Sequence, residues 1–460
     1  MTFRDLLAKL DNWFFKPRSP VPLALFRILV GLLLLQTVLV HHVPDWHLYY
    51  SDNAFLPRQA IMAHWWQFDP IIDFLALLPA GDTWKIGFFA VLVVAALFMT
   101  VGFLTPYAVP IVFLMLLSIN KHFPYNWNGG DSMMQLALFL LAFGRSGDAL
   151  SLDNLIRSAK DDWRKVGFEP VHSPPWVQRM LQLQLALAYL DTFLWKATGS
   201  KWIDGSALYY ALRLREYIKL PLPPLLDTPL FMRVGSWMTL IIEFALCTFI
   251  WFKDVRYYVL LSGLLLHLGI DYCINLPVFE WMFLSMYVLF IEPEDLSKFW
   301  RHVTAKIEQL FGPPRRLTFD GHCLLCVRGT GIFHRMDIFG RYEFVDFRRA
   351  DNRDRLKDLD FERAEREMMV ETEEGWQGGF KAFRIISRSM PLLWFLLPLL
   401  YLPLISFIGE RIYGLIAENR YLLLGRCDDT SCSLHATAYG AENCLAKSGS
   451  ASASEEGEPA

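Results

Sequence analysis

Long runs of hydrophobic residues dominate the first 293 positions of the chain, and polar or charged residues separate them. A helix needs about 20 mostly apolar residues to cross a bilayer. Eight runs approach this length and predict membrane-spanning helices at residues 22–40, 85–104, 107–120, 132–145, 176–195, 232–252, 256–276 and 278–292. The pattern therefore predicts a polytopic α-helical membrane bundle over residues 1–293.

The pattern changes after Pro293 to a charged stretch, residues 294–314, which we interpret as a linker. The next segments alternate in type. They predict a strand at R-L-T-F, a helix from Cys323 to about Asp337, a strand at Y-E-F-V-D-F, a charged helix near 351–367 and a strand at M-M-V-E-T. This order predicts a small α/β domain over residues 315–433, followed by a disordered tail over residues 434–460.

An apolar run at residues 391–408 lies inside this predicted domain, and three prolines interrupt it. Because proline breaks helices, the run favours a helix on the membrane surface or on the α/β core over a ninth span.

Lysine and arginine residues in the short loops predict the orientation of the bundle. They gather before the first span, in the 146–175 loop, near residue 253 and after the last span. With eight spans these segments share one face, so we expect both termini in the cytoplasm and the bundle in a bacterial inner membrane. The 196–230 loop breaks the pattern because five cations fall on the predicted outer face: Lys196, Lys201, Arg213, Arg215 and Lys219. This exception predicts that those cations have partners or that the loop re-enters the protein.

Composition agrees with this interpretation, because 54% of the 460 residues are hydrophobic and 15% are aromatic. The lipid bilayer is the first predicted partner. A net charge of −3 argues against a nucleic-acid partner. Seven cysteines over this length do not form a disulfide scaffold, and no cleavable signal is expected at the N-terminus.

The stretch R-R-L-T-F-D-G-H-C-L-L-C places Cys323 and Cys326 where a strand turns into a helix. Unpaired backbone N–H groups at a helix N-terminus stabilise a thiolate. We therefore predict that Cys323 is an exposed nucleophile and that Cys326, one turn later, resolves the mixed disulfide. Asp320 and Gly321 are expected to form the tight turn, and His322 to add positive charge.

Two other interpretations of the pair remain open. A zinc site would need a second pair, which Cys427 and Cys432 supply with irregular spacing and acidic neighbours. A structural disulfide is disfavoured if the domain is cytoplasmic. Redox chemistry is the leading interpretation, with no metal assigned.

The F-D-G-H-C-L-L-C stretch resembles the signature of the DCC family of thiol-disulfide oxidoreductases. Further matches are V-D-F-R around Asp346, M-V-E-T-E-E-G-W-Q-G-G-F-K-A-F, and A-E-N-R-Y, so the resemblance covers about 315–433. It implies a thioredoxin-like fold, redox roles for Cys323 and Cys326, and a partner protein with a thiol or disulfide. No proline of the kind that faces the thiols in thioredoxins precedes M-M-V-E-T, which departs from standard thioredoxins.

Ionisable residues inside the predicted spans are costly and therefore mark functional candidates. Asp191 lies seven residues after Gln184, on the same face of the fifth span. His267 and Asp271 share a face of the seventh span, where a functional role and a packing hydrogen bond are both consistent with the pattern. Asp131 belongs to the outer turn N-W-N-G-G-D before a span.

The stretch L-W-K-A-T-G-S-K-W-I-D-G resembles the core of the HTTM domain, which is shared with vitamin K-dependent γ-carboxylases. Colinear matches are L-A-L-F-R-I-L-V-G, Y-S-D-N-A-F-L-P-R, N-G-G-D-S-M-M-Q-L and P-V-F-E-W-M-F-L, over roughly 20–293. The resemblance implies Lys196 as a catalytic base, with Lys201 as a rival, and a quinone or hydroquinone as cofactor. The carboxylase histidine is replaced by Asp131 or missing, and the lumenal portion is absent, so γ-carboxylation is not expected.

Three functions follow from these patterns. The leading hypothesis is an enzyme, a membrane-anchored thiol-disulfide oxidoreductase whose bundle binds a quinone-like or other lipid-soluble molecule. The second is a carboxylase- or epoxidase-like membrane enzyme that uses Lys196 as base. The third is a non-enzymatic membrane scaffold with a degenerate thiol domain.

Overall fold

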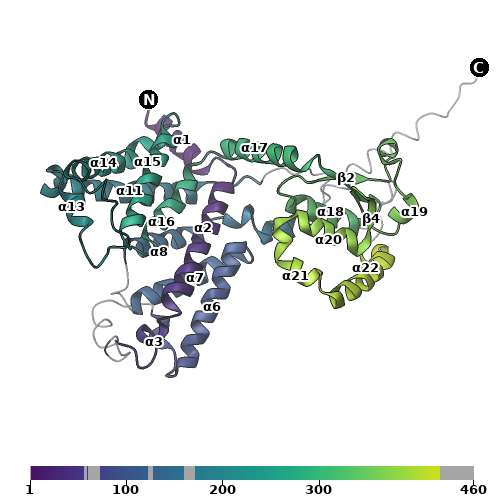
Figure 1. Ribbon diagram of the computed structural model, residues 1–460, viewed down its shortest axis with the longest axis horizontal. Coiled ribbons are helices and arrows are strands. Elements are labelled where there is room, and N and C mark those ends of the chain that lie inside the picture. The colour runs from purple at the N-terminus through teal and green to yellow at the C-terminus, as the bar shows by residue number, and fades with distance from the viewer. Residues whose placement is uncertain (1, 56–59, 61–72, 123–127, 160–170, 425–460) are drawn as a thin grey trace, which may run out of the picture. The chain divides into compact units, whose positions relative to one another are not determined.

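The computed structural model describes residues 2–55, 60, 73–122, 128–159 and 171–424, which fold as two compact units (Figure 1). The membrane unit contains the described residues up to 154 and from 171 to 296. The α/β unit contains residues 155–159 and those from 297 to 424.

The described part of the membrane unit is helical. Its longer helices are α1 (Phe3–Phe15), α2 (Val21–Thr37), α6 (Asp82–Val101), α7 (Thr105–His122), α8 (Gly129–Ala142), α11 (Trp176–Thr198), α14 (Pro229–Thr248), α15 (Arg256–Cys273) and α16 (Phe279–Met286). Short helices are α3 (Trp46–Tyr49), α5 (Phe74–Leu77), α9 (Leu152–Ser158), α12 (Ser200–Ile203) and α13 (Ala207–Ala211). A π-helical turn, η1 (Val38–His42), extends α2. Single 3₁₀ turns are η3 (Ser146–Asp148), η4 (Phe249–Trp251) and η5 (Tyr287–Phe290).

Each of the eight hydrophobic ranges contains a helix, but the helices differ in length. Within the described residues, three are long and apolar enough to cross a membrane, at Val21–His42, Asp82–Val101 and Pro229–Trp251, and a bent pair described below would make four. Helix α8 has 14 residues. It therefore reaches only about 21 Å, against a hydrocarbon core of about 30 Å. The structure supports a membrane protein, while the count of eight spans stays a prediction.

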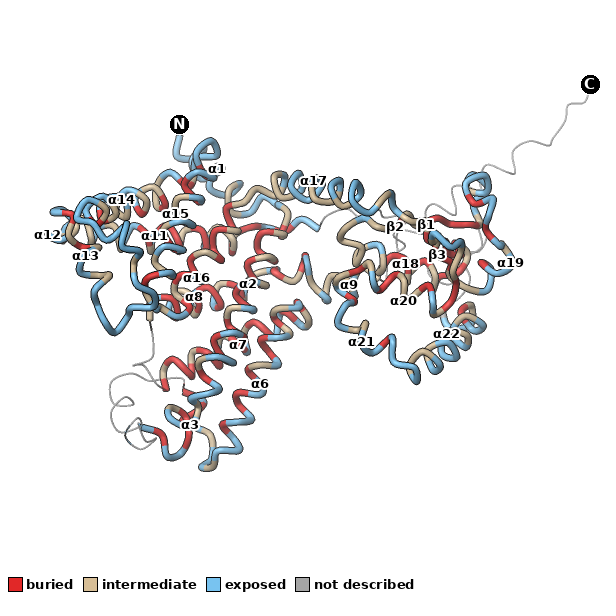
Figure 2. Tube along the Cα trace, in the orientation of Figure 1, coloured by how far each residue is buried: buried red, intermediate tan, exposed pale blue. Residues whose placement is uncertain are grey.

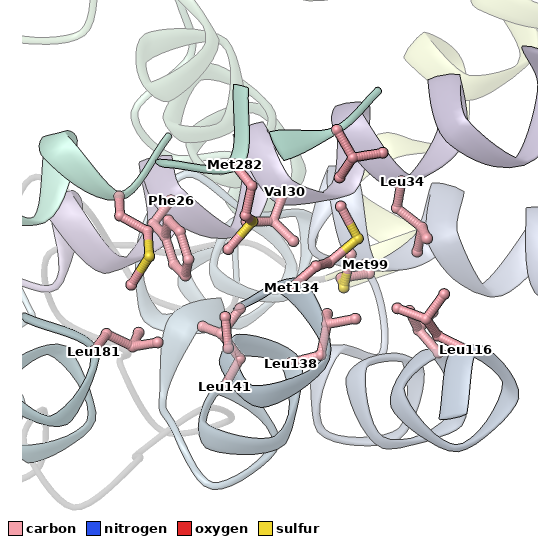
Figure 3. Close-up of a cluster of buried hydrophobic side chains, with 14 of the residues drawn as sticks. Phe26, Val30, Leu34, Met99, Leu116, Met134, Leu138, Leu141, Leu181 and Met282 are labelled. Atoms are coloured by element: carbon pink, nitrogen blue, oxygen red, sulfur yellow. The ribbon is translucent and has the colours of Figure 1, made fainter. Parts of the chain in front are cut away.

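The core of the membrane unit forms where α2 meets its neighbours. Phe26, Val30 and Leu34 recur every four residues of α2, which places them on one face, and all three are fully buried. Figure 3 shows this row facing side chains of α6, α8 and α16, among them Met99, Met134 and Met282. Burial continues along the inner faces of the surrounding helices (Figure 2). This packing holds the helices that carry the polar residues considered below.

The α/β unit contains a four-stranded mixed sheet with helices packed on it. Its elements are α17 (Pro293–Phe311, which starts in the membrane unit), β1 (Arg315–Phe319), α18 (Leu324–Met336), β2 (Tyr342–Asp346), η6 (Ala350–Leu356), α19 (Phe361–Ala364), β3 (Met369–Thr372), β4 (Gly375–Gly378), α20 (Gly379–Ser389), η7 (Pro391–Leu396), α21 (Leu397–Leu400) and α22 (Pro403–Leu424).

The sheet has the strand order β2-β1-β3-β4. Strand β1 runs parallel to β2, with Leu317 opposite Phe344, and antiparallel to β3, with Leu317 opposite Val370. Leu317 and Val370 are fully buried and pack with Ile386 of α20 in one core. Because β1 is a central strand, the loop at its carboxyl end lies between secondary-structure elements on both sides.

One prediction about this unit is wrong, and one strand was missed. The charged helix near 351–367 is instead the 3₁₀ segment η6 and the single turn α19, because the Asp360 side chain accepts a hydrogen bond from the Arg363 N–H and starts a new helix. Strand β4 was not predicted. Its connection to β3 is Glu373–Glu374, which lacks the Asn-Gly signal typical of a tight hairpin.

The apolar run at 391–408 forms η7, α21 and the start of α22. The two arms, Pro391–Leu400 and Pro403–Leu423, bend by 110° at their junction. Helix α22 packs against α18 and α20. This packing places α22 on the α/β core, one of the two alternatives to a ninth span.

Candidate active site

The two motif cysteines lie where β1 gives way to α18. The chain leaves β1 at Phe319, and Cys323 becomes the N-cap of α18. The Cys323 N–H donates to the Asp320 carbonyl (3.2 Å), and the Cys323 Sγ accepts a hydrogen bond from the Cys326 N–H (3.2 Å). The first thiol therefore takes the position that Ser, Thr, Asp or Asn occupies in ordinary N-caps.

The surroundings shift the acidities of the two thiols in opposite directions. A hydrogen bond from the Cys326 thiol lowers the pKa of Cys323, and the Cys326 N–H and the positive charge of Arg420 add to this against the effect of burial. The same thiol–thiol interaction, together with burial, raises the pKa of Cys326. The arrangement stabilises a Cys323 thiolate while the proton stays on Cys326, and a thiolate is the species that attacks a disulfide.

The expectation that Cys323 is exposed is wrong. Its exposed fraction is 0%, whereas Cys326 is partly exposed. A cysteine that caps a helix from inside a β-to-α turn is enclosed by that turn and by the sheet. The thiol that ionises is thus not the thiol that meets solvent.

Cys326 opens into a cavity of about 220 Å³. One wall comes from α18, with Leu325, Thr330 and Phe333, and the opposite wall from α22. The α22 residues in contact with it are Tyr413, Ile416, Ala417 and Arg420. The lining is mainly apolar and also includes the charged residues Asp320, Arg366, Glu367 and Arg420.

Asp320 is the most heavily hydrogen-bonded group beside the thiols. Its side chain is 1% exposed and accepts hydrogen bonds from the guanidinium groups of Arg348 (3.1 Å) and Arg420 (3.1 Å) and from the Tyr421 hydroxyl. Burial acts to raise the pKa of Asp320, but the hydrogen bonds from Arg348 and Tyr421 outweigh it and hold the pKa below its ordinary value. Asp320 is therefore a buried carboxylate held ionised beside the thiol pair.

Gly321 lies in the expected tight turn, which the hydrogen bond from the Cys323 N–H to the Asp320 carbonyl closes, and it has a second role. Its N–H donates to Asp346 Oδ1 (3.1 Å), and a Cβ at this position would lie 1.9 Å from Asp346 Oδ2. Close approach of a carboxylate, rather than an unusual backbone angle, thus requires glycine here. The His322 N–H donates to Asp320 Oδ1 (3.0 Å), and the His322 residue is half-buried.

Sequence reasoning missed three residues of this cluster: Arg348, Arg420 and Tyr421. A signal for them was present, because Arg348 ends the V-D-F-R stretch and the other two end A-E-N-R-Y. Those stretches lie 28 to 101 positions from Asp320, and the fold brings their last residues onto its carboxylate.

The zinc interpretation gains no support from the described residues, among which no group of three or more His, Cys, Asp or Glu side chains could hold a metal ion. Cys427 and Cys432, which it needs, lie outside the described residues, as does Cys444.

Lys196 of α11 and Glu243 of α14 form an ion pair inside the membrane unit. The Glu243 side chain is 8% exposed, and the Lys196 ammonium also lies 5.3 Å from the centre of the Trp202 ring. The Lys196 ammonium is thus held by a carboxylate and lies against an aromatic ring. The geometry therefore opposes the role of Lys196 as a general base.

Three further cations of the 196–230 segment also have partners, as expected from their break with the loop-charge pattern. Lys219 pairs with Asp271 (3.1 Å) and Arg213 with Asp227 (2.7 Å), while Lys201 lies 5.0 Å from the centre of the Tyr210 ring.

His267 and Asp271, expected on one face of a span, have different partners. His267 of α15 pairs through Nδ1 with the fully buried Glu280 of α16, and its Nε2 lies 2.6 Å from the Tyr189 hydroxyl. Tyr189 in turn lies 2.8 Å from the Tyr287 hydroxyl. Four side chains from α11, α15, α16 and η5 thus form one buried hydrogen-bonded chain. Sequence reasoning did not single out Glu280 itself. The residue lies in the P-V-F-E-W-M-F-L stretch, which was quoted only as a match to the HTTM domain.

The two remaining candidates in the membrane unit differ in setting. Asp131 accepts a hydrogen bond from the Asn128 N–H (2.9 Å) and completes a capping box at the start of α8, a structural role. Asp191 is exposed, whereas Gln184, expected on the same face, is buried and donates to the Met133 carbonyl. The two residues lie seven positions apart on α11, as expected for one face of a helix, but they differ in burial.

Comparisons with protein families match two parts of the chain. A family model described as the HTTM domain matches residues 15–294, which is more than half of the chain. A model described as DCC1-like thiol-disulfide oxidoreductase matches residues 317–426, which contain both cysteines and the Asp320 cluster. No solved structure matches the chain.

Proposed function

The chain belongs to the HTTM domain family and carries a DCC1-like thiol-disulfide oxidoreductase domain after it, and from this premise we propose that it is a membrane-anchored thiol-disulfide oxidoreductase. One observation carries the proposal. Cys323 caps α18 with a lowered pKa while the pKa of Cys326 is raised, so one of two adjacent thiols is prepared to attack and the other retains a proton.

The proposed reaction is an exchange with a partner protein that holds a disulfide. The Cys323 thiolate attacks one partner sulfur, the partner S–S bond breaks, and its other sulfur leaves as a thiolate that takes up a proton. Cys326 then loses its proton and attacks the mixed disulfide. The partner is released with two thiols, two electrons richer, and the Cys323–Cys326 pair remains as a disulfide. A second dithiol of the same chemical class returns it to the reduced state.

Further features of the proposal have structural support. The order β2-β1-β3-β4, with a parallel β1-α18-β2 unit and an antiparallel β3-β4 pair, supports a thioredoxin-like fold. The helices within all eight hydrophobic ranges support an eight-span bundle. We propose this bundle for a bacterial inner membrane, with both termini in the cytoplasm.

We also propose that the bundle binds a quinone-like or other lipid-soluble molecule. A cavity of about 640 Å³ lies among α2, α15 and α16, which is room for a drug-sized molecule. Leu29, Leu33 and Leu264 line its apolar part, while Gln36 and the Lys219–Asp271 pair supply polar groups. This cavity, rather than Lys196, is the feature that supports the proposal, because the Lys196 ammonium is held by Glu243.

Thiol trapping in the full-length chain tests the proposed reaction. A Cys326→Ser variant cannot resolve the mixed disulfide and should accumulate adducts on Cys323, which mass spectrometry after non-reducing separation can locate. A Cys323→Ser variant is the matched control and should accumulate at least tenfold fewer adducts. The proposal fails if neither cysteine carries an adduct and the pair shows no reversible reduction potential.

A further inference from the structure

A long uncharged segment follows α20 in the α/β unit. No charged residue occurs between Arg388 and Glu410, and the chain there forms η7, α21 and the first turns of α22. Many large apolar side chains of this segment are exposed: Leu392, Trp394, Phe395, Leu399, Leu402, Leu404, Phe407 and Ile408. An apolar surface of this extent marks a site of interaction with another apolar phase.

The geometry of the segment excludes a simple span. Its first arm, Pro391–Leu400, has 10 residues and reaches about 15 Å, half of the hydrocarbon core. The chain then bends by 110°. Leu393 and Leu400 point inward and are buried, and Leu393 joins the core with Ile386. The segment is therefore fixed to the α/β unit by one face and presents its apolar residues on the other.

Arginine and aromatic side chains border the apolar surface. The guanidinium groups of Arg384 and Arg388 lie 4.8 and 4.6 Å from the centre of the Tyr401 ring, and that of Arg411 lies 4.2 Å from the centre of the Phe407 ring. Tryptophan and tyrosine favour the boundary between lipid and water, and arginine at that depth meets phosphate groups. An apolar centre with a cationic, aromatic rim is complementary to a bilayer surface that contains anionic lipids.

We infer that residues 391–408 insert into the head-group and upper acyl region of a lipid bilayer, as a second membrane contact of the chain, separate from the HTTM domain. Insertion buries the exposed side chains of η7, α21 and the start of α22 in lipid and leaves the charged second half of α22, from Glu410 onward, outside the hydrocarbon.

The inserted helix would also be a wall of the thiol cavity. Tyr413, Ile416 and Ala417 of α22 line the cavity into which Cys326 opens, while Leu404 and Phe407 of the same helix face outward. Gly409 keeps this helix close to α20, because a Cβ there would lie 2.4 Å from the Phe380 ring. If the proposed function holds, the thiol pair works beside the lipid and its substrates are disulfides of membrane proteins. The insertion itself does not depend on thiol chemistry.

Photolabelling of the full chain tests the insertion. The protein is placed in lipid nanodiscs that contain an anionic phospholipid and a phospholipid with a diazirine in its acyl chain, and labelled peptides are identified by mass spectrometry. We expect peptides covering residues 391–408 to be labelled like those from α6, and peptides covering β2 and η6 to stay at background. Labelling of α6 with background labelling of 391–408 would overturn the inference, and so would a cross-link from 391–408 to a second copy in its place.

A set of variants separates insertion from general exposure. The triple change Leu404→Gln, Phe407→Gln and Ile408→Gln alters only exposed side chains and should lower the labelling of the segment about tenfold, equivalent to about 1.4 kcal/mol. Leu415→Gln is the matched control, since Leu415 is an exposed apolar residue of the same helix beyond the proposed insertion, and it should leave labelling unchanged. Unchanged hydrogen exchange in α18 confirms that the variant unit is folded. Undiminished labelling of a folded triple variant contradicts the inference.

Discussion

The two units of this protein bury charged side chains in different ways. In the membrane unit, Lys196 pairs with Glu243 and His267 with Glu280, so each pair joins one helix to another. In the α/β unit a single carboxylate, that of Asp320, accepts hydrogen bonds from three side chains beside two cysteines. Pairing of this kind lowers the cost of burying polar groups in a low-dielectric interior.

The paired groups of the membrane unit hold helices together, whereas the charged groups around Asp320 lie where they can change the acidity of a thiol. Lys196 and His267 are held by partners of their own, and such pairing is what stable helix packing in lipid requires. Around Asp320 the charged groups pair with one another rather than with the thiols, while Arg420 also lowers the pKa of Cys323. Buried ionisable residues alone are thus a weaker sign of catalysis than a nucleophile with an altered pKa.

The largest expected effect comes from removing Asp320. An Asp320→Ala variant leaves Arg420, whose side chain is 8% exposed, without its carboxylate partner. Removal of one partner of a buried ion pair costs about 3–5 kcal/mol. Urea-dependent proteolysis of the α/β unit in the full chain should report this loss. Asp351→Asn, which breaks an exposed pair with Arg349, is the control and should leave the stability nearly unchanged. Equal losses in both variants would contradict the central role of Asp320.

An intermediate effect is expected in the membrane unit. Lys196→Met should destabilise the bundle by roughly 1–3 kcal/mol, because Glu243 is buried and the pair is only partly exposed to water. The double variant Lys196→Met and Glu243→Leu should recover at least half of that loss, as measured by thermal unfolding in detergent. If the double variant lost as much stability as Lys196→Met and Glu243→Leu lose together, the pair would not be coupled. Lys196 would then again be a candidate base.

The smallest expected effect concerns acidity. An Arg420→Gln variant removes a positive charge that lowers the pKa of Cys323, so this pKa should rise and less thiolate should be present at pH 7. The alkylation rate of Cys323 at pH 7 should fall about threefold or more, and its pH profile should shift to higher pH. Arg349→Gln, a change in an exposed pair, should leave the profile unchanged. A profile in Arg420→Gln identical to that of the unaltered chain would show that Arg420 does not act on the thiol.

Local patterns predicted most of the elements that carry the site. The hydrophobic run before F-D-G and the helix after it place Cys323 and Cys326 at a strand-to-helix turn, and the structure has β1 and α18 there. The burial of Cys323 was not predictable, because it depends on packing around the turn. Likewise Asp320 and Arg420 meet across 100 positions, and His267 meets Glu280 on another helix, so neither contact follows from helical or strand spacing. Periodicity indicates which face of an element is buried, but not which partner it finds.

The distance along the chain between Asp320 and its partners has a consequence for synthesis. A nascent chain that ends after α20 already contains both cysteines and the whole sheet, yet it lacks Arg420, Tyr421 and the α22 wall of the cavity. Until residue 421 has been added, the Asp320 carboxylate lacks two of its three side-chain donors, and the cavity beside the thiols lacks its α22 wall. The order of translation therefore completes the reactive centre only after the whole sheet and α20 have been made.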